Sequence, residues 1–298
     1  MHPPHLLKTI LLWFDSGSAE EIPFDAKAVK KVDWLRILPF VFLHAACLGV
    51  IGVGISPVAV LTALFLFWIR IFAVTGFYHR YFSHKTFKTS RAAQFVFALL
   101  GMTAVQRGPL WWAAHHRWHH RYSDTEEDLH SPMRFGFWWS HVGWILSDTY
   151  DKTELHLIRD FAKYPELRWL DRNHLVPPVT LAVSLFLIGG WGALVWGFFL
   201  STVLLWHGSF TVNSLAHLFG RRRYPTTDTS RNNWWLAIIT LGEGWHNNHH
   251  HYMASVRQGF FWWEVDVTFY VLKVLSWARI VWDLRVPPPH VLQPSEAA

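Results

Sequence analysis

The sequence predicts an all-α integral membrane protein with four transmembrane helices, arranged as two hairpins, and a helical cytoplasmic cap. Three observations support this fold class. The 298 residues are 51% hydrophobic, and the mean hydropathy of +0.14 is unusual for a soluble enzyme. Residues 37–69 and 173–220 contain no Asp, Glu, Lys or Arg, and each run exceeds the ~20 apolar residues that cross a bilayer. Turn residues interrupt both runs near the middle, at "GVGISP" (52–57) and "GGWG" (189–192).

These runs divide the chain into five segments. We expect an N-terminal cytoplasmic segment (1–36), transmembrane hairpin 1 (37–78), a central cytoplasmic segment (79–172), transmembrane hairpin 2 (173–217) and a C-terminal cytoplasmic segment (218–298). Ser56 and Pro57 suit the N-cap and first position of the second span. Since the Lys and Arg residues lie outside the hairpins, the positive-inside rule places both termini and the central segment in the cytoplasm.

Two features test this topology. Residues 92–106 are apolar, but fifteen helical residues reach only ~22 Å, so we interpret them as an interfacial or core helix. Arg70 lies in the second span, roughly 20 Å along the helix from Pro57, and we expect its side chain to extend to the cytoplasmic interface.

Four histidine clusters fall on the predicted cytoplasmic side of the membrane. They are "HRYFSH" (His79, His84), "HRWHH" (His116, His119, His120), "NSLAH" (Asn213, His217) and "HNNHH" (His246, His249, His250). The i, i+3, i+4 spacing in "HRWHH" and "HNNHH" places three imidazoles on one helix face, where they can converge on a metal. The i, i+5 spacing in "HRYFSH" does not fit one face of an α-helix and predicts a distorted helix end.

Nine imidazoles exceed what one ion accepts, because zinc takes four ligands and an octahedral ion six. The sequence therefore predicts that the cytoplasmic cap holds a histidine-rich dimetal site with positions left for water or oxygen. Imidazole binds iron, copper and zinc alike, so the ligand type leaves the metal open.

The motifs in this order resemble those of the membrane fatty-acid desaturases of the stearoyl-CoA desaturase type. The resemblance covers roughly residues 60–285 and includes "GPLWW" before the second box, "YSDT" and "GFWWSHVGW" after it, and "RNNWWLAIITLGEGWHNNHH" at the third. It is strongest for the delta-9 branch of bacteria and cyanobacteria. Two positions depart from the pattern of the animal enzymes: His115 replaces an acid, and Leu129 replaces the proline of a "DPH" motif.

The resemblance implies a non-haem di-iron oxidoreductase that uses O2 to place a cis double bond, at delta-9, in a saturated long-chain acyl group carried on CoA or lipid. It implies that two Fe ions are held by His79, His84, His116, His119, His120, His217, His246, His249 and His250. Asn213 is expected to reach the site through a water. The expected location is a bacterial inner membrane, with the site facing the cytoplasm.

Residues near the boxes have several candidate roles. Trp111 and Trp112 could line an acyl tunnel, or belong to the aromatic belt of the membrane interface. We expect His115, His130 and His251 not to be ligands. Asp128 and Glu243 could accept a hydrogen bond from a ligand's second N–H, or could be solvated surface acids.

An external electron donor is required, because the chain contains no dinucleotide-binding fingerprint and no Cys-rich cluster. The family uses acidic ferredoxin or cytochrome b5. The net charge of +6 suits such a donor. The basic residues that could attract it are Lys85, Lys88, Arg91, Arg117, Arg121 and the "RRR" at 221–223. They also suit anionic lipid or CoA, or only set the topology. We expect membrane lipid as the surroundings and no nucleic-acid partner.

Three other functions also use histidine ligands. A zinc metalloprotease of the HExxH type is disfavoured, because Arg or Asn follows the first histidine of each box. A b-type haem electron carrier is suggested by His44 and His207, which lie inside predicted spans. Hydroxylation of an alkyl or acyl chain by a related di-iron enzyme is the nearest alternative within the same metal class.

Overall fold

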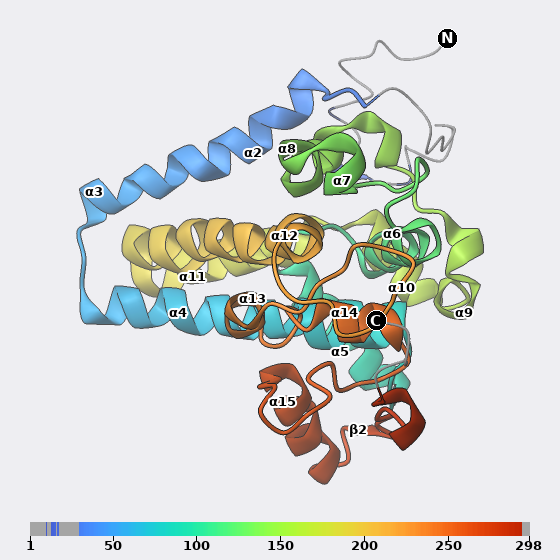
Figure 1. Ribbon diagram of the computed structural model, residues 1–298. Helices are drawn as coiled ribbons and strands as arrows, with labels where there is room; N and C mark the ends of the chain where they lie inside the picture. Colours follow the sequence, from blue (N-terminus) through green and yellow to red (C-terminus); the bar gives the residue numbers. More distant parts are fainter. Residues whose placement is uncertain (1–9, 11–12, 16, 18–29, 294–298) are drawn as a thin grey trace.

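Helices make up almost all of the regular structure in the computed structural model, which describes residues 10, 13–15, 17 and 30–293. Most of the predicted N-terminal segment, 1–36, lies outside these residues. Within the described part, three helices are long and apolar enough to cross a membrane, namely Trp34–Val53, Pro57–Ser83 and Val176–Leu218. They extend to the left in Figure 1, and the shorter helices gather on the right.

The shorter elements form a cap around the ends of the long helices. In chain order they are β1 (Lys88–Thr89), α5 (Arg91–Met102), α6 (Pro109–Tyr122), α7 (Pro132–Phe135), α8 (Phe137–His141), η4 (Gly143–Leu146), η5 (Asp148–Tyr150), η6 (Leu155–Leu157), α9 (Arg159–Ala162), α10 (Pro165–Arg172), α13 (Trp234–Ile239), α14 (His246–His251), α15 (Val267–Trp277), β2 (Val281–Trp282) and η8 (Pro289–Val291). The strands β1 and β2 pair antiparallel.

The first two long helices form a hairpin. The first comprises α2 (Trp34–Ala46), η2 (Cys47–Gly49) and α3 (Val50–Val53). It ends at Gly54, whose φ is 71°, a backbone conformation that glycine adopts without steric strain. The second begins at Pro57 with α4 (Pro57–Phe72), and the Ser56 hydroxyl accepts a hydrogen bond from the Ala59 N–H at 3.2 Å. The predicted N-cap is therefore present.

The third long helix contains a sharp bend where the sequence predicted a turn. It comprises α11 (Val176–Leu194), η7 (Val195–Leu200) and α12 (Ser201–Leu218), but Gly189 and Gly190 have non-helical backbone angles, and φ of Gly190 is 60°. A Cβ atom at Gly197 would lie 3.3 Å from Leu185, whereas residues twelve apart in a straight helix are about 18 Å apart. The chain therefore folds back at the glycine pair. By length and composition the structure has three long apolar helices, where the sequence predicted four spans.

Arg70 corrects one expectation. Its side chain does not reach the interface, because only 1% of the residue is exposed. Nη1 donates to Thr202 Oγ1 at 2.8 Å and to the Thr103 carbonyl at 3.0 Å, and Nη2 donates to Ser201 Oγ. Neutral oxygens from neighbouring segments satisfy the guanidinium inside the protein, so this cation joins helices together instead of snorkelling.

The segment 92–106 contains a short helix, as predicted, and this helix ends at Met102. It forms α5, whose Phe97, Ala98 and Met102 are buried in a core cluster shared with α6 and α10. Leu110, Leu167 and Leu170 of this cluster are fully buried. This core fixes α6 against the end of the second long helix.

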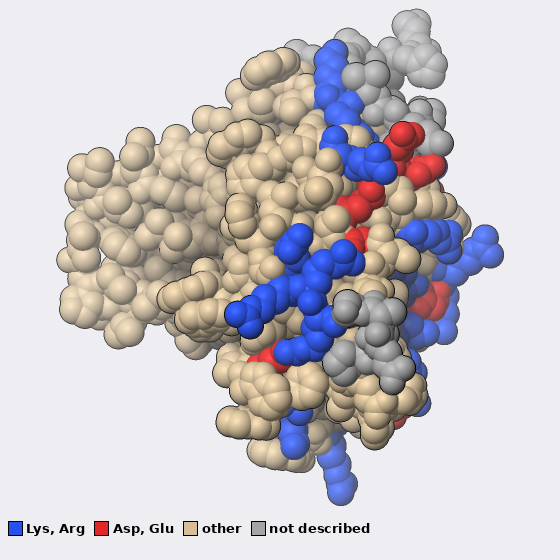
Figure 2. Space-filling view, in the orientation of Figure 1, with Lys and Arg blue, Asp and Glu red and all other residues tan. Residues whose placement is uncertain are grey.

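On the face drawn in Figure 2, charged side chains gather on one part of the surface. Figure 2 shows the region of the long apolar helices without Lys, Arg, Asp or Glu on the visible face, and the charges gathered on the half that holds the cap. This separation fits a protein whose apolar half lies in lipid and whose cap lies in water.

Candidate metal centre

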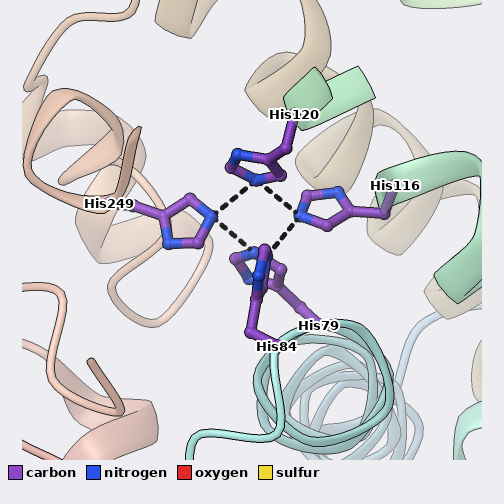
Figure 3. Close-up of side chains that lie close together, drawn as sticks. All are labelled: His79, His84, His116, His120 and His249. Carbon is purple, nitrogen blue, oxygen red and sulfur yellow. Dashed lines mark hydrogen bonds between the residues drawn. The ribbon is translucent and has the colours of Figure 1, made fainter. Parts of the chain in front are cut away.

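Five histidines from three segments converge on one point. They are His79, His84, His116, His120 and His249, and one ring nitrogen of each lies within 4.8 Å of those of the others. Figure 3 shows their rings facing a common centre. The Nε2 atoms of neighbouring rings are 2.9 to 3.0 Å apart. We refer to these five residues as the first histidine group.

The other four histidines form a second group beside the first. His119, His217, His246 and His250 are all buried, and their ring nitrogens also lie within 4.8 Å of one another. Nε2 of His217 and Nε2 of His246 are 3.1 Å apart. The ring centroids of His120 in the first group and His250 in the second are 4.4 Å apart, so the two groups adjoin. All nine histidines of the predicted ligand set lie in these two groups.

Local geometry explains this division. On α6 the rings of His116 and His120 point to the first group, and His119 points to the second. On α14 the pattern is reversed. One histidine, His249, joins the first group, and two, His246 and His250, join the second. Each short helix therefore supplies histidines to both groups.

The "HRYFSH" box lies at the end of a π-helix. Residues Ala73–Ser83 form η3, which continues α4, and His84 is its C-cap. In a π-helix the backbone hydrogen bond joins residues i and i+5, so His79 and His84 come to the same side. The predicted distortion of this helix end is confirmed.

The spacing of the nitrogens suits a metal ion. Ligands at right angles around an ion with metal–imidazole bonds of about 2.1 Å lie about 3.0 Å apart. The distances of 2.9 to 3.1 Å between neighbouring Nε2 atoms agree with this value. In the second group Nε2 of His250 is buried without a hydrogen-bond partner among the described residues, although its Nδ1 is bonded. A metal ion would satisfy it.

Carboxylates hold the opposite nitrogen of four of these rings. His79 Nδ1 contacts Glu243, His119 Nδ1 lies 2.9 Å from Asp128, His217 Nδ1 lies 3.2 Å from Asp124 and His250 Nδ1 lies 2.8 Å from Asp228. Such pairs orient the ring and leave Nε2 as the metal-binding atom. Asp128 and Glu243 are therefore buried partners of the histidines and not surface acids.

Protonation of the site follows from its burial. Burial lowers the pKa of His116, His120, His246 and His249 well below the ordinary value, and the neighbouring imidazoles lower it further. These four rings are neutral near pH 7, which is the form that binds metal. Burial pushes the pKa of Asp228 upward, but its hydrogen bond with His250 holds the pKa well below the usual range. This acid is therefore ionised.

Several buried partners were not predicted. Asp124 and Asp228 lie in loops, and only the motif "YSDT" drew attention to the first. Arg80, inside the first box, is completely buried; it lies 2.9 Å from Glu243 Oε1 and 2.9 Å from Asp266 Oδ1. Gln258 donates to Glu243 Oε2 at 3.0 Å. A signal for Arg80 was its position next to a candidate ligand at the end of an apolar span.

Two cavities adjoin the histidines. Asn213 lines a small cavity of about 50 Å³ together with His79, His116, His119 and His246. A larger cavity of about 230 Å³ shares Trp112, His116 and Asn213 with it. Its wall also contains Trp111, so both tryptophans singled out in the sequence face this cavity.

The three histidines expected not to be ligands lie outside both groups. His115 and His130 line the larger cavity. His130 stacks beside His119 with ring centroids 4.4 Å apart. His251 is exposed and stacks on Tyr224 at 4.0 Å.

The structure argues against axial haem ligation by His44 and His207. Their Nε2 atoms are 3.0 Å apart and hydrogen-bond to each other. Two axial imidazoles on opposite sides of an iron stand about 4 Å apart, with the porphyrin between them. The other nitrogen of His207 bonds His141 at 3.0 Å, so these rings join the membrane helices to α8.

Comparisons with known proteins agree with this site. The family model described as fatty acid desaturase matches residues 55–273. The chain is 38% identical over 249 residues to an sn-1 stearoyl-lipid 9-desaturase of Anabaena variabilis, covering 83% of this chain and 91% of the relative. It is 36% identical over 289 residues to an acyl-CoA 5-desaturase of Anemone leveillei (92% and 88% covered), and 33% identical over 261 residues to delta-9 acyl-lipid desaturase 1 of Arabidopsis thaliana (87% and 85% covered).

The family model covers well over half of the chain, and the three relatives named above match 83 to 92% of it. The resemblance of the histidine boxes to those of the desaturases is thereby confirmed. The alternative function of a b-type haem electron carrier is wrong. The chain is an integral membrane protein and an oxidoreductase that belongs to the fatty acid desaturase family.

Proposed function

We propose that this enzyme uses O2 and two non-haem irons to introduce a cis double bond at delta-9 of a saturated long-chain acyl group carried on a membrane lipid or on CoA. The observation that carries the proposal is the set of nine histidines, divided into adjoining groups of five and four. The donors in both groups are imidazoles, which suit iron among several transition metals, and the match to the fatty acid desaturase family favours iron among these.

The first histidine group would hold one iron and the second the other, with Asn213 contributing through a water. When bound, the two irons supply the oxidising chemistry that activates O2 and removes two hydrogens from adjacent methylenes. The residues of the chain orient the ligands and balance the charge. Glu243, Asp128, Asp124 and Asp228 hold the imidazoles by Nδ1, and Arg80 neutralises Glu243.

The larger cavity is proposed to bind the acyl chain. Trp111 and Trp112 form rigid apolar walls beside His116, and the buried Phe210 and Leu43 line the same cavity. A methylene held there would lie against the ligand residues and away from bulk water. Both indole N–H groups are hydrogen-bonded within the protein and leave no unpaired donor facing the acyl chain. Trp111 Nε1 donates to the Tyr150 carbonyl at 2.7 Å, and Trp112 Nε1 donates to Gln106 at 3.1 Å.

We propose that the bent third helix crosses the membrane twice. The reversal at Gly189–Gly190 gives two arms, so that hairpin 1 (37–78) and hairpin 2 (173–217) provide four spans and the segments 1–36, 79–172 and 218–298 lie in the cytoplasm. The close approach of Gly197 to Leu185 supports this reading. A bacterial inner membrane is the proposed location, with the histidines on the cytoplasmic face.

An external donor must deliver two electrons in each turnover. We propose a small acidic protein of the ferredoxin or cytochrome b5 type, attracted by the positive face of the cap. Lys85, Lys88 and Arg91 lie on this cap and are more than half exposed. Each also pairs with a carboxylate, namely Asp160, Asp283 and Glu166 in turn, so the attraction depends on the excess of Lys and Arg over Asp and Glu in the chain.

Expression in a host that lacks its own desaturases tests the proposal. Gas chromatography with mass spectrometry should show a new monounsaturated fatty acid with its double bond between carbons 9 and 10, and the purified protein should contain about two irons. The acyl carrier is identified by supplying labelled stearoyl-lipid and stearoyl-CoA separately. A double bond at another position would correct the delta-9 assignment alone.

The same experiment separates desaturation from hydroxylation. With ¹⁸O2 as the oxidant, a desaturase releases both oxygen atoms as water and leaves none in the fatty acid. Retention of ¹⁸O in the main product would contradict the proposed reaction and favour the hydroxylase.

A further inference from the structure

A groove on the cap combines arginine and tryptophan side chains outside the metal centre. It has a volume of about 720 Å³ and shares no lining residue with the acyl cavity. Its lining consists of Gly220, Arg221, Arg222, Arg223, Asn232, Asn233, Trp234, Trp235, Trp245, Trp263 and Glu264. We call it the Arg–Trp groove.

The groove carries an excess of positive charge. Three guanidinium groups face a single carboxylate, that of Glu264, which is buried and already paired with Arg223. Arg221 and Arg222 are exposed, and no ion pair within the described part of the chain involves either of them. Figure 2 shows Lys and Arg gathered in the region where Figure 1 draws α13 and α14. Arg222 Nη2 donates to the Thr226 carbonyl at 2.7 Å, so the guanidinium of Arg221 and the remaining N–H groups of Arg222 are available to an anion.

The rim of the groove is apolar and borders the membrane region. Trp234 and Trp235 at the start of α13 are 51% and 63% exposed, and Ile238 and Ile239 on the same helix are 47% and 45% exposed. A Cβ atom at Gly208, inside the membrane helix α12, would lie 3.6 Å from Ile239. Because α13 packs on a membrane helix and exposes apolar side chains, its outer face meets lipid, and its tryptophans lie at the depth of the headgroups.

We propose that the Arg–Trp groove binds the phosphate headgroup of an anionic membrane phospholipid from the cytoplasmic leaflet. The planar, forked guanidinium matches the geometry of phosphate oxygens, and indole rings favour the level of the headgroups. A soluble acidic protein fits less well, because the tryptophan and isoleucine rim would be immersed in lipid. This lipid is additional to the substrate and occupies a separate site.

Hydrogen bonds connect the groove directly to helix α14, which carries three of the clustered histidines. Asn247 Oδ1 accepts hydrogen bonds from the backbone N–H of Arg223 at 2.7 Å and of Tyr224 at 2.8 Å. Asn232 Nδ2 donates to Asn248 Oδ1 at 2.7 Å. A lipid that orders the arginine segment therefore also steadies the helix that carries His246, His249 and His250.

Lipid titration followed by native mass spectrometry tests the site and requires no desaturase activity, so its failure is distinct from failure of the proposed function. The wild-type protein in neutral detergent should bind phosphatidylglycerol at least about tenfold more tightly than phosphatidylcholine. Binding of phosphatidylglycerol should also raise the melting temperature. Equal affinity for the two lipids would overturn the proposal.

Paired variants locate the site. Arg221→Gln/Arg222→Gln should lower the affinity for phosphatidylglycerol about tenfold or more, and Arg221→Gln alone should give a smaller loss in the same direction. The control, Lys273→Gln/Arg279→Gln, removes the same charge from exposed positions outside the groove and should leave the affinity unchanged. Equal losses in both pairs would mean that only net charge matters and would overturn the site. An increased KM for reduced ferredoxin with unchanged lipid affinity in Arg221→Gln/Arg222→Gln would also overturn it and would assign the groove to the electron donor.

Discussion

The two histidine groups differ in the charge that surrounds them. In the first group of five rings, one carboxylate, Glu243, bonds a ring nitrogen, whereas three carboxylates bond rings of the second group of four. Glu243 also pairs with Arg80, so part of its negative charge is balanced by the protein itself. The second group is therefore the better electrostatic site for a divalent cation, and the first depends on a single acid.

Neighbouring histidines on α14 give the largest expected effect. His249→Ala removes a proposed iron ligand from the first group and His250→Ala one from the second, although the two positions are adjacent. Either change should abolish new double bonds and reduce the bound iron from about two per chain to about one or fewer, because each ring occupies its own coordination position. Fatty-acid profiles and elemental analysis of the purified proteins measure both effects. Wild-type levels of product from either variant would refute its assignment as a ligand.

Removing carboxylates tests the comparison itself. Glu243→Gln and Asp228→Asn should each lower iron affinity or activity by about 10- to 100-fold, as expected for partners of metal-bound histidines. The loss should be larger for Glu243→Gln, because it removes the one acid bonded to the first group and leaves Arg80 with Asp266 alone. Iron titration monitored by absorbance ranks the two variants. The reverse order would show that the surplus of acids around the second group is essential and not redundant.

A change at Asp171 should affect both histidine groups alike, because its side chain holds the first turn of α6, the helix that carries histidines of both groups. Its Oδ1 accepts hydrogen bonds from the Leu110 and Trp111 N–H groups at 3.0 and 2.9 Å. Burial raises the pKa of Asp171 to about 6, and these bonds offset only part of the rise. An acid whose pKa is raised by folding stabilises the fold below its unfolded pKa and loses this contribution as the pH rises through about 6.

Asp171→Asn cannot ionise, so the variant does not lose folding stability at this position as the pH rises. The Asn side-chain oxygen still accepts hydrogen bonds from the two N–H groups. Between pH 4 and 7 the melting temperature of the variant should therefore rise relative to wild type, by the equivalent of up to roughly 3 kcal/mol. Thermal unfolding in detergent at several pH values measures the difference. A pH-independent difference between the two proteins would contradict burial of an ionisable acid at this position.

His251→Ala should have the smallest effect. The residue follows His250 directly, but it is exposed and lies outside both groups. Iron content and product yield should stay within about twofold of wild type, and stability should change by less than about 1 kcal/mol. This variant serves as the matched control for His249→Ala and His250→Ala, and a loss of iron in it would extend the ligand set.

Sequence reasoning reached the histidines because helical spacing is a local property. The i, i+3, i+4 pattern in "HRWHH" and "HNNHH" places rings on one face whatever the remainder of the fold does, and the i, i+5 pair implied a departure from the α-helix. The charge-free runs likewise identified the apolar helices, since hydropathy depends on composition alone.

The environment of several residues depends on partners that are distant in the sequence, so their roles could not be predicted from single positions. Arg70 was expected at the interface, but hydroxyls of Ser201 and Thr202, more than a hundred residues away, satisfy it inside the protein. Asp124 and Asp228 carry no periodic pattern, so only their contacts with His217 and His250 identify them as part of the site.

The sequence by itself determined that this is a helical membrane protein with nine clustered imidazoles, because apolar length and helical spacing are encoded over a few turns of chain. Only the tertiary structure decided which five histidines face one centre and which four face the other, and which acids support them. That division depends on how α6, α14 and η3 pack together, and this packing brings His79 and His249, which are 170 positions apart in the sequence, into contact.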